Sequence, residues 1–336
     1  MNISRLDLIA DLQDRVNAVI GNYLAEKPFA LVDFPNIRNV GDSAIWLGEM
    51  AYFSRLGYAP TYVSEMSDYS ATALRGAVPD GPIFIHGGGN FGDIWEAHQD
   101  FRERIIEEWP DRQIIQLPQS IHYGSMARVE KTARVIGRHK NFVLLVRDQE
   151  SLSFAKKHFD CDVYLCPDMA LCIGPIRPNA ARFPILAMLR ADKEKSGDYN
   201  LSAYPGLPVE DWITESARSI QMVKLRNRLT SLGKDTQSAR LAKFNSLAQT
   251  RFTRGVTQIS RGRAIVTDRL HVHIVSLLLG RPHATLDNSY GKIGRFMAAF
   301  TGDNGLSYRT KSFDDAMRWA MDEGQRLADQ NAVDGE

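Results

Sequence analysis

The sequence predicts an α/β protein built from two parallel-sheet domains that share a cleft. Short apolar strands alternate with helical stretches along most of the chain, which is typical of a parallel sheet covered by helices on both faces. The 336 residues exceed one ordinary core, and one break rich in proline and glycine, GPIRPNAARFP, divides them. We expect an N-terminal domain with a leading helix over 1–175, a linker over 176–184 and a C-terminal domain with a terminal helix over 185–336.

The elements of the first domain follow this alternation. An amphipathic helix is indicated over 1–20, where apolar residues recur at positions 6, 9, 12, 16, 19 and 20. The strands expected after it are PFALVDF, APTYVSEM, PIFIHGGG, RQIIQLPQS, NFVLLVRD and DVYLCPDMAL. The helices expected between them are GDSAIWLGEMAYFSRLG, FRERIIEEW, MARVEKTARVIGRH and SLSFAKKHF.

The second domain is expected to begin with the strand ILAMLRAD. Two further strands, AIVTDRL and RPHATLDN, and the terminal helix SFDDAMRWAMDEGQRLADQ follow it. Open parallel sheets bind ligands beyond the carboxyl ends of their strands, so polar residues at those ends are the candidates for a site.

Composition and patterning exclude several classes of protein. The net charge of +1 makes no case for a nucleic-acid partner. Cys161, Cys166 and Cys172 are odd in number and lack a histidine pair at zinc-ligand spacing, so we interpret them as thiols in a reducing cytoplasm. The N-terminus does not resemble a signal peptide, and no apolar run reaches the roughly 18 residues of a membrane span. We expect a cytoplasmic protein, soluble or peripheral at the inner face of the membrane.

Two glycine motifs are candidate anion sites. In NVGDSAI, Gly41 at a helix start lets backbone amides approach a phosphate, although Asp42 or Ser43 could simply cap the helix. In IFIHGGGNFGD, Gly88 and Gly89 follow an apolar strand, where glycines permit close backbone approach to a ligand.

Charged side chains also follow two strands of the first domain. Arg147 comes directly after FVLLV and offers a two-donor fork for a carboxylate or phosphate, or else pairs on the surface with Asp148 or Glu150. His122 follows IIQL and is either structural or catalytic.

The stretch TDRLHVHI places more such groups at a strand-to-helix junction in the second domain. Arg269 and His271 fall where the positive end of a helix favours an anion. Placed across the cleft from Arg147 and His122, they would form one site with two cations and two titratable rings. His273 points elsewhere if the helix has begun, and we interpret it as structural.

A serine hydrolase of the GDSL type is one alternative. Ser43, the GGGN stretch at 87–90 and the pair Asp268 and His271 occur in the required order. However, PNIRNVG and Asp42 separate the serine from its strand, and neither a G-x-N-D block nor a G-x-S-x-G elbow is present.

The ordered series NVGDSAI, HGGGNFGD, PQSIH, VRDQES, PDMAL, TDRLHVHI and LDNSYGK, spread over roughly residues 30 to 300, resembles the polysaccharide pyruvyl transferase family. This resemblance implies transfer of the enolpyruvyl unit of phosphoenolpyruvate onto two hydroxyls of a sugar, with formation of a ketal and release of phosphate. It also implies two Rossmann-like domains facing a cleft, as in glycosyltransferases of the B type. A nucleotide-sugar glycosyltransferase on the same fold is the third alternative, although no clear E-x-x-x-x-x-E motif appears.

The resemblance further implies roles for single residues. The positions that match those holding phosphoenolpyruvate are Arg147, Arg269, Leu270 and His271, and His122 matches the histidine of PQSIH. Many members carry glycine after the R-L-H triplet, where Val272 stands here.

The chemistry of such a transfer needs fixed cations, aimed amides and a proton carrier. We expect Arg147 and Arg269 to supply the charge, and the helix starts near Gly41, Gly89 and Leu270 to supply amides. Either His271 or His122 carries the proton, and Asp268 either orients a histidine or caps the helix. Candidates for sugar hydroxyls are Asp42, Asn90 and Asp93. Neither a metal nor a cofactor is required.

The segment 218–263 carries eleven lysines and arginines against one acid, Asp235. It is either a solvated helical face or a surface held near anionic lipid head groups or a polyprenyl-diphosphate-linked acceptor.

Overall fold

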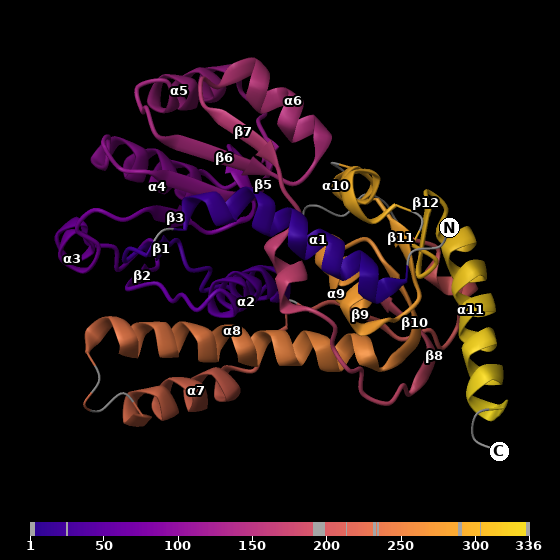
Figure 1. Cartoon of the computed structure of the whole chain (residues 1–336). Coiled ribbons are helices and arrows are strands. Elements are labelled where there is room, and N and C mark those ends of the chain that lie inside the picture. Colours follow the sequence, from indigo (N-terminus) through magenta and orange to yellow (C-terminus); the bar gives the residue numbers. More distant parts are fainter. Residues whose placement is uncertain are drawn as a thin grey trace.

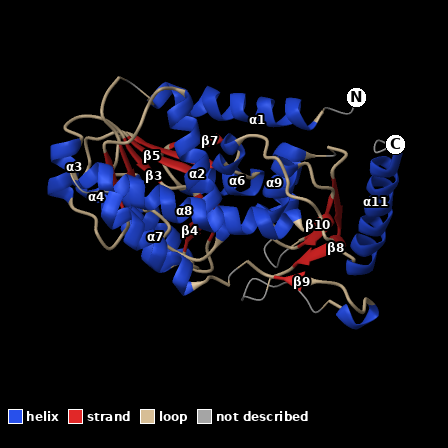
Figure 2. Ribbon diagram, turned by 90° about the horizontal axis from the view of Figure 1, so that it is seen from below, coloured by secondary structure: helices blue, strands red, loops and turns tan. Residues whose placement is uncertain are grey.

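The structure is a computed structural model that describes residues 4–333, apart from 25, 191–198, 213, 231–232, 234, 288–290 and 303, and apart from the side chains of 328 and 330–333. It contains two parallel β-sheets with helices around and between them (Figure 1). Figure 2 shows the same two sheets from below, with α11 at one end of the molecule. The predicted α/β class is confirmed, and the arrangement is consistent with a Rossmann-like, glycosyltransferase-B-like fold.

The N-terminal sheet has the strand order β2-β1-β3-β5-β6-β7, with β4 beside β5, and its pairs are parallel. Its strands are β1 (Ala30–Val32), β2 (Tyr62–Ser64), β3 (Ile83–Ile85), β4 (Gly88–Gly92), β5 (Ile114–His122), β6 (Phe142–Val146) and β7 (Asp162–Leu165). Every residue of β1, β2, β3 and β6 is buried, as expected for strands covered on both faces. The glycine-rich stretch that was predicted to approach a ligand contains a strand of its own, β4.

Successive residues of these strands alternate between two hydrophobic cores. Leu31 and Phe84 belong to the core that α2 shares, whereas Val32 and Ile85 belong to the core that α4 and α5 share. The helices of this half are α2 (Val40–Arg55), α3 (Ala71–Ala77), α4 (Glu96–Glu108), α5 (Met126–Ile136) and α6 (Gln149–His158). The sequence pattern predicted all of these except α3.

The C-terminal sheet has the order β12-β11-β10-β8-β9, again with parallel pairs. Its strands are β8 (Phe183–Met188), β9 (Val209–Glu210), β10 (Gly262–Thr267), β11 (His283–Leu286) and β12 (Ser307–Thr310). The helices of this half are α9 (Leu270–Leu279), α10 (Lys292–Phe296) and α11 (Phe313–Val333). Two short strands, β9 and β12, were not predicted, and β8 begins inside the predicted linker, at Phe183.

Three helices connect the two halves. The first, α1 (Arg5–Ile20), places Leu8 and Leu12 in the core that also holds Leu278 of α9. The hairpin of α7 (Ala217–Thr230) and α8 (Thr236–Ser260) follows the C-terminal β9, yet α8 extends back along α2 (Figure 1). Phe244 of α8 stacks on Phe34 at a centroid distance of 4.1 Å. How the chain divides into domains stays a prediction, because one core spans both sheets.

Short helical turns complete the described chain. They are η1 (Gly21–Tyr23), η2 (Met169–Ile173), η3 (Leu201–Ala203) and the π-helical turn η4 (Met297–Thr301). Among the described helices, none is both long enough and apolar enough to cross a membrane. The three cysteines are free thiols, and burial raises the pKa of Cys172 to about 12.

Candidate active site

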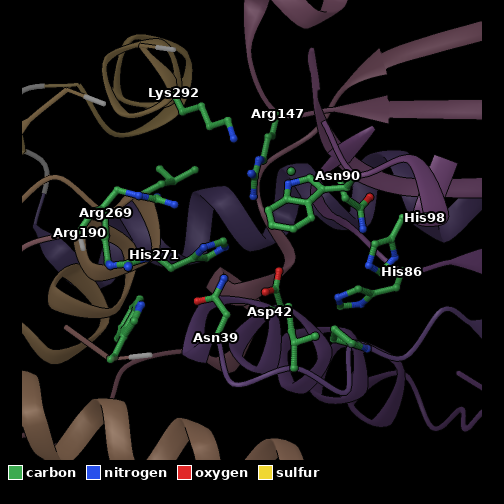
Figure 3. A pocket seen from close by; sticks show the side chains of 16 residues that line it. Asn39, Asp42, His86, Asn90, His98, Arg147, Arg190, Arg269, His271 and Lys292 are labelled. Atoms are coloured by element: carbon green, nitrogen blue, oxygen red, sulfur yellow. The ribbon is translucent and has the colours of Figure 1, made fainter. Parts of the chain in front are cut away.

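A cavity of about 300 Å³ lies where the carboxyl ends of strands from both sheets face each other (Figure 3). The N-terminal half contributes Pro35, Ile37, Asn39, Asp42, His86, Gly89, Asn90, Trp95, His98 and Arg147. The C-terminal half contributes Arg190, Trp212, Arg269, Leu270, His271 and Lys292. The structure thus brings together seven of the residues predicted from sequence: Asp42, Gly89, Asn90, Arg147, Arg269, Leu270 and His271. We call this cavity the donor pocket, after the donor substrate that the sequence led us to expect.

Arg147 is held rigidly at the wall of the donor pocket. It follows β6, is 2% exposed, donates from Nε to Ser120 Oγ at 3.0 Å and bonds through Nη1 to Asp168. Burial alone would raise the pKa of Asp168, but the charges of Arg147 and His271 outweigh burial and hold that pKa well below its usual range. Arg147 therefore keeps a charged partner behind it while its guanidinium borders the cavity. The surface pairs proposed for Arg147 are wrong, because Asp148 caps α6 and Glu150 pairs with Arg295.

His271 meets the same carboxylate from the other half of the protein. Its Nε2 lies 3.4 Å from Asp168 Oδ2, at ion-pair distance. Its ring also packs against the start of α2, where a Cβ added to Gly41 would lie 2.4 Å from His271 Nδ1. The expectation that Gly41 lets amides approach a phosphate needs correction, since Gly41 does not line the donor pocket and its missing side chain makes room for His271.

Arg269 forms the N-cap position of α9 and borders the cavity on the C-terminal side. Its Nη2 donates to Asp211 Oδ2 at 2.7 Å, and both side chains are at most 10% exposed. The backbone N–H of Arg269 donates to Thr267 Oγ1 at 3.0 Å, which fixes the turn from β10 into the helix. Each predicted cation is therefore oriented by an ion pair with a carboxylate that is at most 10% exposed: Arg147 by Asp168 and Arg269 by Asp211.

The absence of a side chain at Gly89 leaves room for two cations of the pocket lining, Arg147 and Lys292. A Cβ on Gly89 would lie 3.0 Å from Arg147 Nη2 and 3.7 Å from Lys292 Nζ. Gly88 beside it has φ of 137°, a conformation that favours glycine, although Gly88 does not line the cavity. Lys292 and Arg190 add to the positive lining and were missed from sequence. Lys292 ends the LDNSYGK motif but was given no role there, and Arg190 was read only as part of the strand ILAMLRAD.

Two histidine–carboxylate pairs on the N-terminal wall were also missed. His86 follows β3, and its Nδ1 lies 2.8 Å from Glu49 Oε2, whose carboxylate also accepts the Gly87 N–H. Burial alone would lower the pKa of His86, but the charge of Glu49 and its hydrogen bond outweigh burial and raise it. His98, in α4, places Nδ1 3.0 Å from both carboxylate oxygens of Asp33.

The Asp33 backbone is unusual. Its φ of 70° is the one positive value among the described residues other than glycine. A non-glycine residue in this region costs free energy and persists only where its surroundings hold it. Here the strained backbone directs a buried carboxylate at His98.

Of the two histidines, His86 could have been predicted by its position, because it follows a buried strand just as Arg147 does. His98 carries no such signal.

The three candidates for sugar contacts are in different places. Asp42 lies in the first turn of α2 and lines the donor pocket. Asn90 also lines it, and its Oδ1 accepts from Arg102 at 2.7 Å and from Gln119 at 2.9 Å, so its Nδ2 is the amide atom left for a ligand. Asp93 is not among the described lining residues, and its carboxylate accepts the N–H groups of Gly124 and Ser125 instead.

The predicted pair of Asp268 and His271 does not form. Asp268 is buried and accepts from the Arg190 N–H at 2.8 Å and from the Tyr199 hydroxyl at 3.0 Å, and burial raises its pKa. Ser43 is 1% exposed and outside the described pocket lining, so the hydrolase triad is not assembled either.

The remaining histidines lie outside the cavity. His122 ends β5 and is absent from the described lining of the donor pocket. His273 points away from the cavity, with Nδ1 2.7 Å from His283 Nε2, and burial lowers its pKa well below the usual value, which agrees with the structural role predicted for it. Val272 is fully buried in the core rather than narrowing the pocket.

Comparison with a solved structure defines the fold class first. An uncharacterized protein of Klebsiella pneumoniae superposes with a TM-score of 0.58, with 17% identity over 89% of this chain and 98% of that one. The chain shares this α/β fold with it.

Sequence comparison then gives the family. The family model for polysaccharide pyruvyl transferase matches residues 39–290. Pyruvyl transferase 1 of Schizosaccharomyces pombe is 31% identical over 292 residues, which cover 80% of this chain and 69% of that protein. The putative pyruvyl transferase EpsO of Bacillus subtilis is 28% identical, with coverage of 84% and 88%. The chain belongs to the polysaccharide pyruvyl transferase family and is a pyruvyltransferase.

Proposed function

We propose that this chain transfers the pyruvyl group of phosphoenolpyruvate to two hydroxyls of a sugar, in a polysaccharide or its lipid-linked precursor, with formation of a ketal and release of phosphate. The observation that carries this proposal is the lining of the donor pocket. Among the described residues that line this pocket, four are cations and one, Asp42, is a carboxylate. A small molecule that bears both a carboxylate and a phosphate suits such a site, because preorganised cations offset its charge without having to move.

The two halves of the pocket suggest how the donor lies. The C-terminal wall offers Arg269, Lys292 and the first turn of α9, whose positive end favours a phosphate. Arg147 borders the opposite wall and presents the planar fork that suits a carboxylate. In this placement the phosphate faces His271, and the methylene carbon faces the N-terminal histidines.

Proton transfer then divides between the two walls. His98, whose Nδ1 is held by Asp33, has Nε2 left to deliver a proton to the methylene carbon, which makes C2 electrophilic toward a sugar hydroxyl. A second hydroxyl then displaces phosphate from C2, and His271 donates a proton to the departing phosphate. The two attacking hydroxyls lose one proton each, and these protons return to His98 and His271, which each donated one. This assignment replaces His122 with His98, because only His98 of the two lines the described pocket.

The acceptor is proposed to enter past Trp95. This side chain lines the pocket yet is 45% exposed, so its ring can stack against a sugar at the mouth. Asp42 and Asn90 Nδ2 then lie where hydroxyls can be bonded.

A lipid-linked acceptor is supported by part of the basic segment only. Its cations on α8 are mostly paired within the protein, as Arg240 with Asp68 and Arg254 with Glu215. On α7, by contrast, three apolar side chains are 59–61% exposed: Met222, Leu225 and Leu229. Arg218, Lys224 and Arg226 are exposed on the same helix. We propose α7, rather than the whole segment, as the contact with an anionic lipid surface.

The direct test is a product analysis. Protein, phosphoenolpyruvate and a panel of glycans, free and polyprenyl-diphosphate-linked, are incubated together, and phosphate release and acceptor mass are followed. We expect one phosphate released for each acid-labile pyruvyl group gained by the sugar. Transfer from another donor, with no reaction from phosphoenolpyruvate, would refute the proposed donor.

A further inference from the structure

A second cavity, of about 780 Å³, lies between α7, α8 and the segment that precedes β8. It shares no lining residue with the donor pocket. Four arginines line it: Arg182, Arg251, Arg254 and Arg261. We call this cavity the arginine groove.

The charge of the arginine groove is unbalanced. Glu215 is the one carboxylate among its described lining residues, and it pairs with Arg251 at 2.8 Å and with Arg254 at 3.3 Å. Arg261 pairs with Glu210, which lies outside the lining. Four guanidinium groups against two carboxylates leave two positive charges, and a concave surface concentrates their field.

Hydrogen-bond donors in the groove also lack partners. Arg251 is 4% exposed, yet its Nη1 has no hydrogen bond to the described residues, and the same holds for Arg254 Nε. Arg182, at the edge of the groove, is exposed, and its side chain makes no hydrogen bond or ion pair within the described chain. A buried donor without a partner is costly, and an anion is the partner that guanidinium groups bind most strongly.

We propose that the arginine groove is a second anion site, which binds a phosphate or diphosphate group. Two negative charges on such a group would balance the groove. The hydroxyls of Ser219 and Thr257, on α7 and α8, line the groove and can donate to oxygens of the ligand. The site stands whatever the donor pocket binds, because its residues and charges are separate.

The groove is nevertheless coupled to the rim of the donor pocket. Arg251 Nη2 donates to Asn36 Oδ1 at 3.2 Å, and Arg254 Nη2 donates to the carbonyl oxygens of Arg38 and Trp212, each at 2.7 Å. Asn36 and Arg38 alternate along the chain with Pro35, Ile37 and Asn39, which line the donor pocket. The groove therefore adjoins one edge of the donor pocket. An acceptor could place its diphosphate in the groove while its sugar lies in the donor pocket.

The test uses inorganic pyrophosphate and isothermal titration calorimetry. Arg182→Gln removes a groove cation that has no partner within the described chain, so folding should be unaffected. We expect this change to weaken pyrophosphate binding by about tenfold or more, since a charge-assisted hydrogen bond is lost. Arg177→Gln is the matched control, because Arg177 is exposed in the same segment and does not line the groove. The Arg177→Gln variant should bind pyrophosphate with the same affinity as the parent.

A second variant tests the groove from the other side. Ser219→Glu places a carboxylate among the arginines from the surface of α7 and should also weaken pyrophosphate binding, while phosphoenolpyruvate binding is retained by both groove variants. No pyrophosphate binding by the parent, or equal binding by the parent and both variants, would overturn the proposal.

The source of the phosphate group is then identified with vesicles. Neutral vesicles with and without a polyprenyl diphosphate are sedimented with the parent, Arg182→Gln and Arg177→Gln. Sedimentation that requires the polyprenyl diphosphate and is lost only in Arg182→Gln supports a lipid-linked ligand. Pyrophosphate binding without such sedimentation supports the same site with a soluble ligand.

Discussion

His271 Nε2 lies 3.4 Å from Asp168 Oδ2, and the same carboxylate oxygen bonds Arg147. Asp168 follows β7 of the N-terminal sheet, whereas His271 lies in the first turn of α9, the helix that follows β10 of the C-terminal sheet. One buried carboxylate thus orients a cation from one half and a histidine from the other. The donor pocket is assembled only when both halves are in place.

Asp168→Asn tests this shared carboxylate. Asparagine keeps the shape but leaves the buried Arg147 without a charged partner, so we expect unfolding to become easier by about 3 kcal/mol. The pKa of Asp168 is lowered in the folded protein, so its contribution is complete above its unfolded pKa of about 4 and fades as pH falls toward the folded value. Chemical denaturation of parent and variant between neutral and acid pH measures this. A stability difference that grows on acidification would contradict the account.

Gly41→Ala tests the contact between α2 and His271. The added methyl would lie 2.4 Å from His271 Nδ1, so the ring must move, and we expect a destabilisation of about 1–3 kcal/mol. Because His271 would lose its position beside Asp168, kcat should also fall under conditions where the variant is still fully folded.

Gly76→Ala is the control for that change. Gly76 lies in α3 with nothing within 4 Å of an added Cβ, so this variant should keep full activity and gain slightly in stability. Equal activity of the two variants would show that Gly41 does not serve to admit His271.

The pair of His86 and Glu49 predicts a pH dependence. The pKa of His86 is raised, so its positive charge beside the donor pocket is present below the unfolded value of about 6.5 and is lost only as pH rises through the folded value. In Glu49→Gln the amide still accepts from Gly87, but the ring loses its opposing charge and its pKa should fall. As the pH rises, the affinity for phosphoenolpyruvate should therefore begin to fall at a lower pH in Glu49→Gln than in the parent. Histidine titration by NMR provides the independent measurement, and an unchanged His86 titration would contradict the prediction.

The proposed lipid contact predicts salt-dependent sedimentation with anionic vesicles. Each cation of α7 near the surface adds about 1 kcal/mol at low salt, and this attraction is screened as salt rises. Leu225→Glu should abolish sedimentation, since it places an acid among the exposed apolar side chains. Leu6→Glu is the control, because Leu6 is similarly exposed at 56% but lies on α1. Sedimentation that both variants lose equally would argue against α7.

The sequence could predict what depends on local pattern. Arg147 and Arg269 were found because each follows a buried strand, and the carboxyl ends of parallel strands form the ligand-binding edge of a sheet. The alternation of strands and helices likewise predicted both sheets. The strands β9 and β12 were missed because neither contains a buried apolar run: β9 has two residues, and the residues of β12 are polar or partly exposed.

Partners distant in sequence could not be predicted. Asp268 was assigned to His271 by proximity in sequence, but the turn before α9 sends its carboxylate to Arg190 and Tyr199 instead. His98 reaches the pocket only because α4 packs where its first turn meets Asp33, which no local pattern encodes. The same holds for Gly41, whose partner His271 lies in the other half of the chain.

Calorimetric titration with phosphoenolpyruvate tests the central claim most directly, using the parent, Lys292→Gln and Ser43→Ala. Lys292 lines the donor pocket, whereas Ser43 is buried outside it with no hydrogen bond to its Oγ among the described residues. The account predicts that the parent and Ser43→Ala bind equally and that Lys292→Gln binds about tenfold more weakly or worse. Binding that is indifferent to Lys292, or no binding by the parent with or without a glycan acceptor, would contradict it.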